Sequence, residues 1–171
     1  MKKIVVLFTS LLLLSCSSDD NTNSNPIPTG SDTVTFSFND ENFSTTNNEL
    51  NFEKSHVFIN SIGSSLIMVK ISNMEKETAV ELTIGSEVIF EEGKTYAING
   101  LQTANLTGRI FYYGNKIPSM NCYTNNEIGG SLTVVKLDYQ RKIFAAIFNF
   151  NAVEENGTMH SIKNGWLDLK I

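Results

Sequence analysis

Apolar and polar residues alternate with a period of two along most of the chain after residue 32, and no stretch keeps helical spacing over eleven residues. The segment 33–38, for example, places Val34, Phe36 and Phe38 on one face. Because successive side chains of a strand point to opposite sides, this pattern predicts β-strands that bury one face.

The last third of the chain carries the clearest strand pattern. A strand over residues 131–137 is followed by a polar turn at 138–142, a return strand over 143–150 and a final strand over 166–171. The apolar side chains expected to share a face on the last two strands are Phe144, Ala146, Phe148, Phe150, Leu167, Leu169 and Ile171.

Shorter strands are predicted over residues 56–62, 66–71, 79–84, 95–98 and 109–113. Strands that recur at about 8 to 12 residues with turn residues between them are typical of antiparallel sandwiches and barrels. We therefore predict one all-β domain over residues 32–171, an antiparallel β-sandwich of roughly 8–10 strands, because one apolar face per strand suits two stacked sheets. A partly open β-barrel is the alternative.

The N-terminal segment has a different character. Lys2 and Lys3 precede an apolar run over residues 4–14. Eleven residues of helix rise about 16 Å, which is well short of a bilayer core of about 30 Å. Residues 1–15 therefore predict a signal peptide and not a transmembrane helix.

The sequence Leu-Leu-Ser-Cys at residues 13–16 resembles the lipobox of bacterial lipoproteins. In that family the cysteine is acylated and becomes the first mature residue. The resemblance implies that Cys16 is lipidated, and several acyl chains at about 0.8 kcal/mol per buried CH2 make a lasting membrane anchor. An ordinary signal peptide with a chance cysteine is the alternative.

The four residues after this cysteine are Ser17, Ser18, Asp19 and Asp20. They resemble the serine and acidic export signal of lipoproteins of the Bacteroidota, which implies an outer-membrane protein at the cell surface. A solvated tether that happens to contain two aspartates is the alternative. The polar composition of residues 21–30 predicts a flexible spacer, so we expect residues 16–31 to form the lipidated cysteine and its tether.

Three segments near the C-terminus, 129–138, 143–153 and 161–171, together resemble the ending of a group of flavobacterial-type Bacteroidota lipoproteins of unknown function. Residues 33–45 resemble the opening of that group, although Glu41 and Asn42 stand where the group has a glycine. The resemblance implies an all-β extracytoplasmic domain, and it implies no catalytic residues.

Charge narrows the range of partners. The 171 residues carry a formal net charge of −5, and loss of Lys2 and Lys3 with a signal peptide makes the remainder more acidic. Because nucleic-acid binding needs a basic surface, we predict no nucleic-acid partner.

Candidate chemistry is sparse. If Cys16 is lipidated, Cys122 has no disulfide partner, and as a nucleophile it would need a histidine base. His56 and His160 sit in no recognisable signature, are too few for zinc unless carboxylates join them, and His160 lies in a turn-like segment that predicts solvent exposure. We predict that Cys122 is a half-buried structural thiol, and we predict no catalytic residue, no metal and no cofactor.

The paired carboxylates of the loops are expected to be solvated, so a calcium site or a hydrolase is less favoured.

Aromatic residues give the one hint of binding. Tyr112 and Tyr113 are adjacent, so one of them is expected to point outward, near Asn115. Tyr123, Tyr139 and Trp166 fall at strand ends or outward positions. Exposed aromatic rings beside amides suit sugars, so the candidate ligand-binding residues are Tyr112, Tyr113, Asn115 and Trp166. The alternative is that Tyr and Trp are simply common in strands.

Residues 32–34 resemble the short O-glycosylation motif of Bacteroidota secreted proteins, which implies a modified Thr33. We expect a surface-exposed or periplasm-facing outer-membrane lipoprotein that acts as a non-catalytic binding module for a glycan or an envelope partner. This function requires an outward patch of aromatic and amide side chains. A structural protein of the envelope would instead require an apolar patch or an open strand edge. A hydrolase would require converging carboxylates.

Overall fold

The computed structural model describes residues 26–46, 50–59, 65–73, 78–86, 88–100, 106–114 and 117–171. Within these ranges the regular structure consists of eleven strands. They are β1 (Thr33–Phe38), β2 (Glu41–Ser44), β3 (Leu50–Ile59), β4 (Ser65–Asn73), β5 (Thr78–Ser86), β6 (Thr95–Ile98), β7 (Leu106–Gly114), β8 (Ile117–Tyr123), β9 (Gly130–Asp138), β10 (Ile143–Val153) and β11 (Met159–Lys170). The predicted all-β class is confirmed, with more strands than the roughly 8–10 expected.

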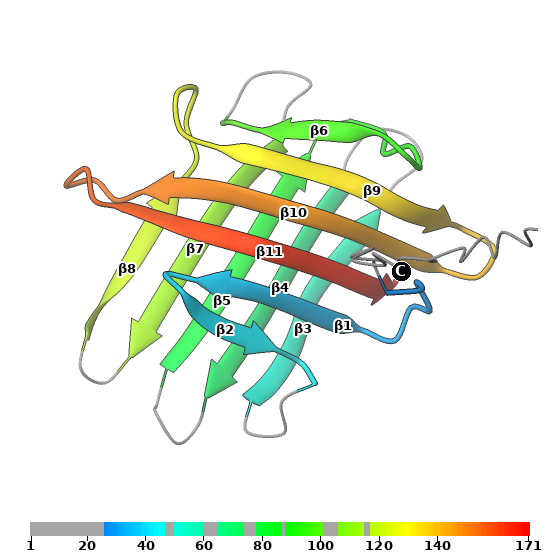
Figure 1. Cartoon of the computed structure of the whole chain (residues 1–171), viewed down its shortest axis with the longest axis horizontal. Helices are drawn as coiled ribbons and strands as arrows, with labels where there is room; N and C mark the ends of the chain where they lie inside the picture. The colour runs from blue at the N-terminus through cyan, green and yellow to red at the C-terminus, as the bar shows by residue number, and fades with distance from the viewer. Residues whose placement is uncertain are drawn as a thin grey trace, which may run out of the picture.

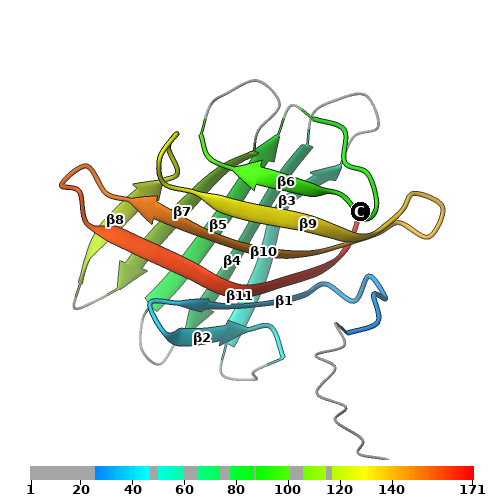
Figure 2. The same cartoon turned by 45° about the horizontal axis from the view of Figure 1, so that its top comes forward.

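The strands form two layers (Figure 1). β6, β9, β10, β11, β1 and β2 lie in one layer, and β3, β4, β5, β7 and β8 lie behind them with a different strand direction. The same arrangement is visible after rotation (Figure 2). Hydrogen bonding is continuous in the order β2-β1-β11-β10-β9-β6-β7-β5-β4-β3. The layers are joined where β6 meets β7 in a parallel pair, Ile98 opposite Leu106.

A closed ring of five strands lies at the centre of this arrangement. β8 leaves the main order and pairs with both β7 and β10, so that β10, β9, β6, β7 and β8 enclose a small barrel. The joint between β8 and β10 consists of one residue pair, Val153 opposite Tyr123. The remaining strands extend from this ring as the two layers, so the predicted sandwich and its barrel alternative each describe part of the fold.

The core lies between the layers and follows the predicted alternation. Val34, Phe36 and Phe38 of β1 are 0%, 2% and 4% exposed. The predicted inward positions of β10 and β11 that are buried with them are Phe144, Ala146, Phe148, Phe150, Leu167 and Leu169. Burying each large apolar side chain of this kind contributes about 1.5–3 kcal/mol, so these faces supply much of the stability of the fold.

The segment before β1 is attached to the domain. Asp168 of β11, only 3% exposed, accepts hydrogen bonds from the Thr29 amide at 2.9 Å, the Thr29 hydroxyl at 3.0 Å and the Gly30 amide at 2.6 Å. The last residues of the predicted flexible tether are therefore held on the domain by a carboxylate more than 130 residues away in the chain.

The predicted signal peptide, Cys16, and the export signal Ser17–Asp20 lie outside the described residues. Among the residues that the structure describes, no helix is long and apolar enough to cross a membrane.

Candidate functional site

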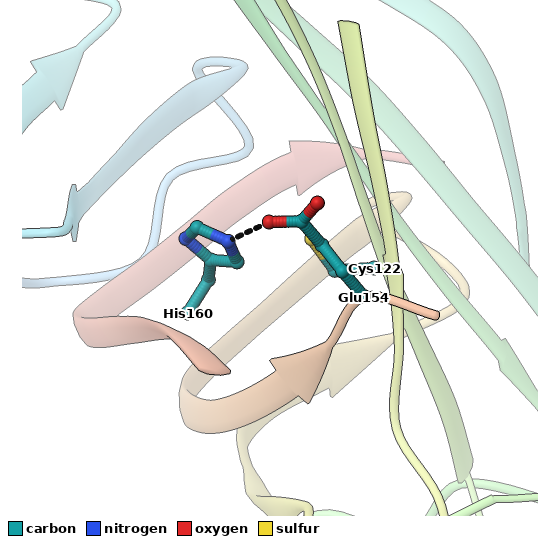
Figure 3. Close-up of side chains that lie close together, drawn as sticks. All are labelled: Cys122, Glu154 and His160. Carbon is teal, nitrogen blue, oxygen red and sulfur yellow. Dashed lines mark hydrogen bonds and ion pairs between the residues drawn. The ribbon is translucent and has the colours of Figure 1, made fainter. Parts of the chain in front are cut away.

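Three side chains with metal-binding or catalytic chemistry meet at the joint between β8 and β10. Cys122 comes from β8, Glu154 directly follows β10, and His160 is the second residue of β11 (Figure 3). One ligand atom from each side chain lies within 4.8 Å of the other two. The residue pairs that bring them together are Val153 with Tyr123 and Ala152 with His160. We refer to these three residues as the Cys–Glu–His cluster.

Hydrogen bonds hold both ring nitrogens of His160. Its Nε2 lies 2.6 Å from Glu154 Oε1, and its Nδ1 lies 2.8 Å from Asn39 Nδ2. The Ser161 amide donates to Asn39 Oδ1 at 3.3 Å, so the NH2 group of Asn39 must be the part that faces the imidazole. In this arrangement Nδ1 accepts from Asn39, and the Nε2–H donates to Glu154.

Cys122 is a protected thiol. Its side chain is fully buried, and burial together with the nearby charge of Glu154 raises its pKa to about 11. Both nitrogens of His160 are engaged with other partners, so neither is available to take the thiol proton. The cluster therefore brings a thiol, an imidazole and a carboxylate together without activating the thiol as a nucleophile.

Two predictions about these residues are wrong. His160 was expected in solvent, but it is 8% exposed and packs on Phe38 with ring centroids 5.9 Å apart. Cys122 was expected to be half-buried, but its exposed fraction is 0%. The turn-like composition of residues 155–161 led to the expected exposure, whereas β11 begins at Met159 and carries His160 inward. His56 lies in β3, and its side chain is outside the described residues.

A second group of polar and aromatic side chains lies on the outer face of β7 and β8. Tyr123 is 47% exposed, and the Arg109 guanidinium lies over its ring, 5.5 Å from the centroid. Arg109 Nε donates to Asn121 Oδ1 at 2.8 Å, and Asn121 Nδ2 donates to Tyr123 Oη at 2.6 Å. The same guanidinium lies 5.8 Å from the ring centroid of Phe111. We call Arg109, Phe111, Asn121 and Tyr123 the β7–β8 aromatic surface.

Of the predicted ligand-binding residues, Tyr112 and Trp166 have described side chains, and both are buried. Tyr112 faces the core, is 7% exposed and lies 5.5 Å from Phe38 between ring centroids, so it is not the outward member of its pair. The side chain of Tyr113 and the whole of Asn115 lie outside the described residues. Trp166 was expected to point outward because it alternates with the inward Leu167. That expectation is wrong, since only 7% of Trp166 is accessible.

Two other tyrosines behave as the sequence predicts. Tyr123 ends β8 and Tyr139 lies in the turn after β9, and each is 47% exposed. The alternation of β8 points to the outward position of Tyr123, but nothing in the sequence identifies Arg109 and Asn121 as its neighbours. They meet because Arg109 is paired with Tyr123 and Phe111 with Asn121 across the two strands.

A hollow of about 320 Å³ lies beside the bulge between β10 and β11. Its lining residues are Gly129, Asn149, Phe150, Asn151, Ile162, Lys163 and Asn164. The lining is rich in amides but contains no tyrosine or tryptophan. The hollow is therefore the alternative location for a ligand, against which the β7–β8 aromatic surface can be tested.

Thr33, the predicted glycosylation position, is half-buried in β1, and its hydroxyl lies 2.8 Å from that of Ser31. Its modification stays a prediction. Comparisons of the chain with protein-family models, curated proteins and solved structures gave no significant match. Function is therefore inferred from the surfaces described above.

Proposed function

We propose that this protein is a non-catalytic binding module of the outer membrane, anchored through acylated Cys16, presented at the cell surface and related to Bacteroidota lipoproteins. Its ligand is a glycan of the envelope or its surroundings, bound at the β7–β8 aromatic surface. The observation that supports this proposal is Tyr123, half exposed and fixed between a guanidinium and an amide.

The chemistry of this surface matches that of a sugar. An aromatic ring offers an apolar face with a polar tip, on which the C–H face of a pyranose can stack. Asn121 takes one of the five N–H donors of the Arg109 guanidinium, so others can reach hydroxyl or carboxylate oxygens of a saccharide. Both neutral and acidic sugars are therefore suitable ligands.

The surface is also held in place before any ligand binds. Arg109 is fixed by its bond to Asn121 and by the rings of Phe111 and Tyr123, and Asn121 in turn fixes the Tyr123 hydroxyl. Side chains that are already ordered lose less conformational entropy on binding, which favours affinity at a small surface. The protected thiol of Cys122 and the engagement of both His160 nitrogens with other partners support the non-catalytic part of the proposal.

The test compares two tyrosines with equal exposure. Binding of neutral and acidic oligosaccharides to the purified protein is measured by calorimetry for the wild type, Tyr123→Ala and Tyr139→Ala. Both tyrosines are 47% exposed, so a general loss of surface aromatic area affects the two variants equally. We expect Tyr123→Ala to weaken saccharide binding by about tenfold or more, and Tyr139→Ala to leave it unchanged.

Two results would contradict this proposal. One is an absence of binding to every saccharide by a folded wild-type protein. The other is loss of binding in Asn149→Ala with retention in Tyr123→Ala, which would place the ligand in the hollow beside β11.

The second candidate is a protein-interaction role, favoured by the edge of the sheet. β3 is ten residues long and stands last in the strand order, and within the described residues it pairs only with β4. A long edge strand can accept a strand from a partner. The opposite edge, β2, has four residues and is a poorer template. Partner-dependent protection of β3 amides from hydrogen exchange would support this role.

A further inference from the structure

We propose that Cys122, Glu154 and His160 form a Zn²⁺ site that fastens β8 to the ends of β10 and β11. The zinc proposal does not depend on the proposed saccharide surface. Cys122 points inward between Asn121 and Tyr123, so the two sites occupy opposite sides of the same strand.

The positions of the donor atoms suit zinc after small side-chain movements (Figure 3). Zinc binds sulfur at about 2.3 Å and nitrogen or oxygen at about 2.0–2.2 Å, which places neighbouring ligand atoms about 3.3–3.6 Å apart in a tetrahedron. The three donors already lie within 4.8 Å of one another. The sulfur has to approach its partners by no more than about 1.5 Å, since no separation exceeds 4.8 Å, and Nε2 and Oε1, now 2.6 Å apart, must separate by about 0.7 Å.

The surroundings of the cluster favour zinc over harder cations. A thiolate and an imidazole are ligands that Zn²⁺ prefers, whereas Mg²⁺ and Ca²⁺ require mostly oxygen. Cys122 is fully buried and the His160 side chain is 9% exposed, while the Glu154 side chain is 24% exposed. The cluster is therefore dry on the Cys122 side and open at Glu154, where a water molecule can complete the coordination.

Metal binding requires defined proton movements. The Cys122 thiol loses its proton to solvent, since only the thiolate is a ligand. The His160 proton leaves Nε2, which binds the metal, and a proton returns to Nδ1, so the imidazole stays neutral. One proton is released for each zinc ion, and the charges of the thiolate and the Glu154 carboxylate balance that of Zn²⁺.

Asn39 must respond to this change of tautomer. A proton on Nδ1 would face the NH2 group of Asn39, so the amide must rotate and present Oδ1 as an acceptor. The rotation gives up a long bond of 3.3 Å from the Ser161 amide. A carboxylate at this position would accept from Nδ1 and from Ser161 together. Asn39 has a φ of 47°, a conformation that aspartate also tolerates, so Asn39→Asp is compatible with the backbone.

The location gives the metal a structural role. β8 and β10 are joined by the single pair Val153 and Tyr123, and the cluster residues Cys122 and Glu154 are their direct sequence neighbours. A zinc ion held by both residues adds a second link at the joint that closes the five-stranded ring.

The experiment titrates the purified protein with Co²⁺ as a spectroscopic probe and then with Zn²⁺. We expect one equivalent of Co²⁺ to produce a thiolate charge-transfer band, Zn²⁺ to displace it, and Zn²⁺ to raise the melting temperature. Cys122→Ser should abolish the band. Cys16→Ser is the matched control, since it removes the other cysteine of the chain and should leave the band unchanged.

Two further variants test the geometry. Glu154→Gln replaces a proposed ligand and should weaken zinc binding by about tenfold or more. Asn39→Asp changes the partner of a ligand and should strengthen zinc binding by about tenfold, which is the size of effect that outer-shell partners have at zinc sites. Saturating Co²⁺ without a thiolate band, a band that persists in Cys122→Ser, or zinc affinity unchanged in Glu154→Gln would overturn the proposal. If Cys122→Ser does not fold, Glu154→Gln and Asn39→Asp decide the question, and equal zinc affinity in both would overturn it.

Discussion

The carboxylate of Asp168 should hold the segment before β1 on the domain, and Asp168→Asn tests this with little change of shape. Three hydrogen bonds of 2.6–3.0 Å converge on this carboxylate from Thr29 and Gly30. Bonds to a charged acceptor contribute about 1.5–3 kcal/mol each, which sets an upper range of about 4.5–9 kcal/mol for the three. Two effects reduce the net value. First, Asp168→Asn removes the free-energy cost of burying a charged side chain in the folded state. Second, Thr29 is exposed, so its amide and hydroxyl can donate to water when the bonds to residue 168 are lost. We expect a net loss of about 2–4 kcal/mol.

Urea unfolding of the purified protein measures this loss. With a slope of about 2 kcal/mol per molar urea, the unfolding midpoint should fall by about 1–2 M. Ser31→Ala is the control, because Ser31 makes only a 3.4 Å contact with the same carboxylate and should shift stability by less than about 0.5 kcal/mol. Limited proteolysis should then cleave near residues 29–31 in Asp168→Asn and not in the control. If the two variants unfold at the same urea concentration, the carboxylate does not stabilise this attachment.

Other predictions concern packing and protonation. Gly130→Ala would place a Cβ 1.9 Å from the Asn149 carbonyl oxygen and should cost more than about 3 kcal/mol in urea unfolding, whereas Gly157→Ala, with φ of 88° and open space around it, should cost about 1 kcal/mol. Equal losses in the two variants would contradict the assigned contact between β9 and β10. Thr124→Val removes the acceptor of a buried Gly108 amide and should cost about 1–3 kcal/mol by the same measurement. The pKa of Cys122 rises from 9.0 to about 11 on folding, so between these pH values the unfolded chain binds fewer protons and stability should fall as pH rises. The fall should be smaller in Cys122→Ala than in the wild type, and an equal fall in both would assign the titration to another group.

The strands could be predicted from the sequence where one face is apolar and the other polar. β1 alternates cleanly, and its bounds match the expectation. The first part of β10 is apolar and buried on both faces, and its alternation begins only near Ile147, but the strand starts at Ile143 as expected. β11 was expected from residue 166 but begins at Met159, because Asn164 and Gly165 interrupt the alternation. Gly165 is required there, since a Cβ would lie 2.5 Å from the Phe148 carbonyl oxygen. β8 was not predicted, because Pro118 and the polar residues around Met120 conceal its short apolar pattern.

The two sites differ in how far the sequence determines them. Alternation along β8 places Asn121 and Tyr123 on one side and Cys122 on the other, which a strand assignment alone would have revealed. What faces Cys122 depends instead on the register of β8 against β10, and a shift of one residue would exchange the two sides of the strand. That register is set by the pairing of Val153 with Tyr123 and by the longer pairing of β8 with β7. The joint that positions the Cys–Glu–His cluster also orients Tyr123. Zinc bound on the inner side should therefore make the proposed saccharide surface on the outer side more rigid.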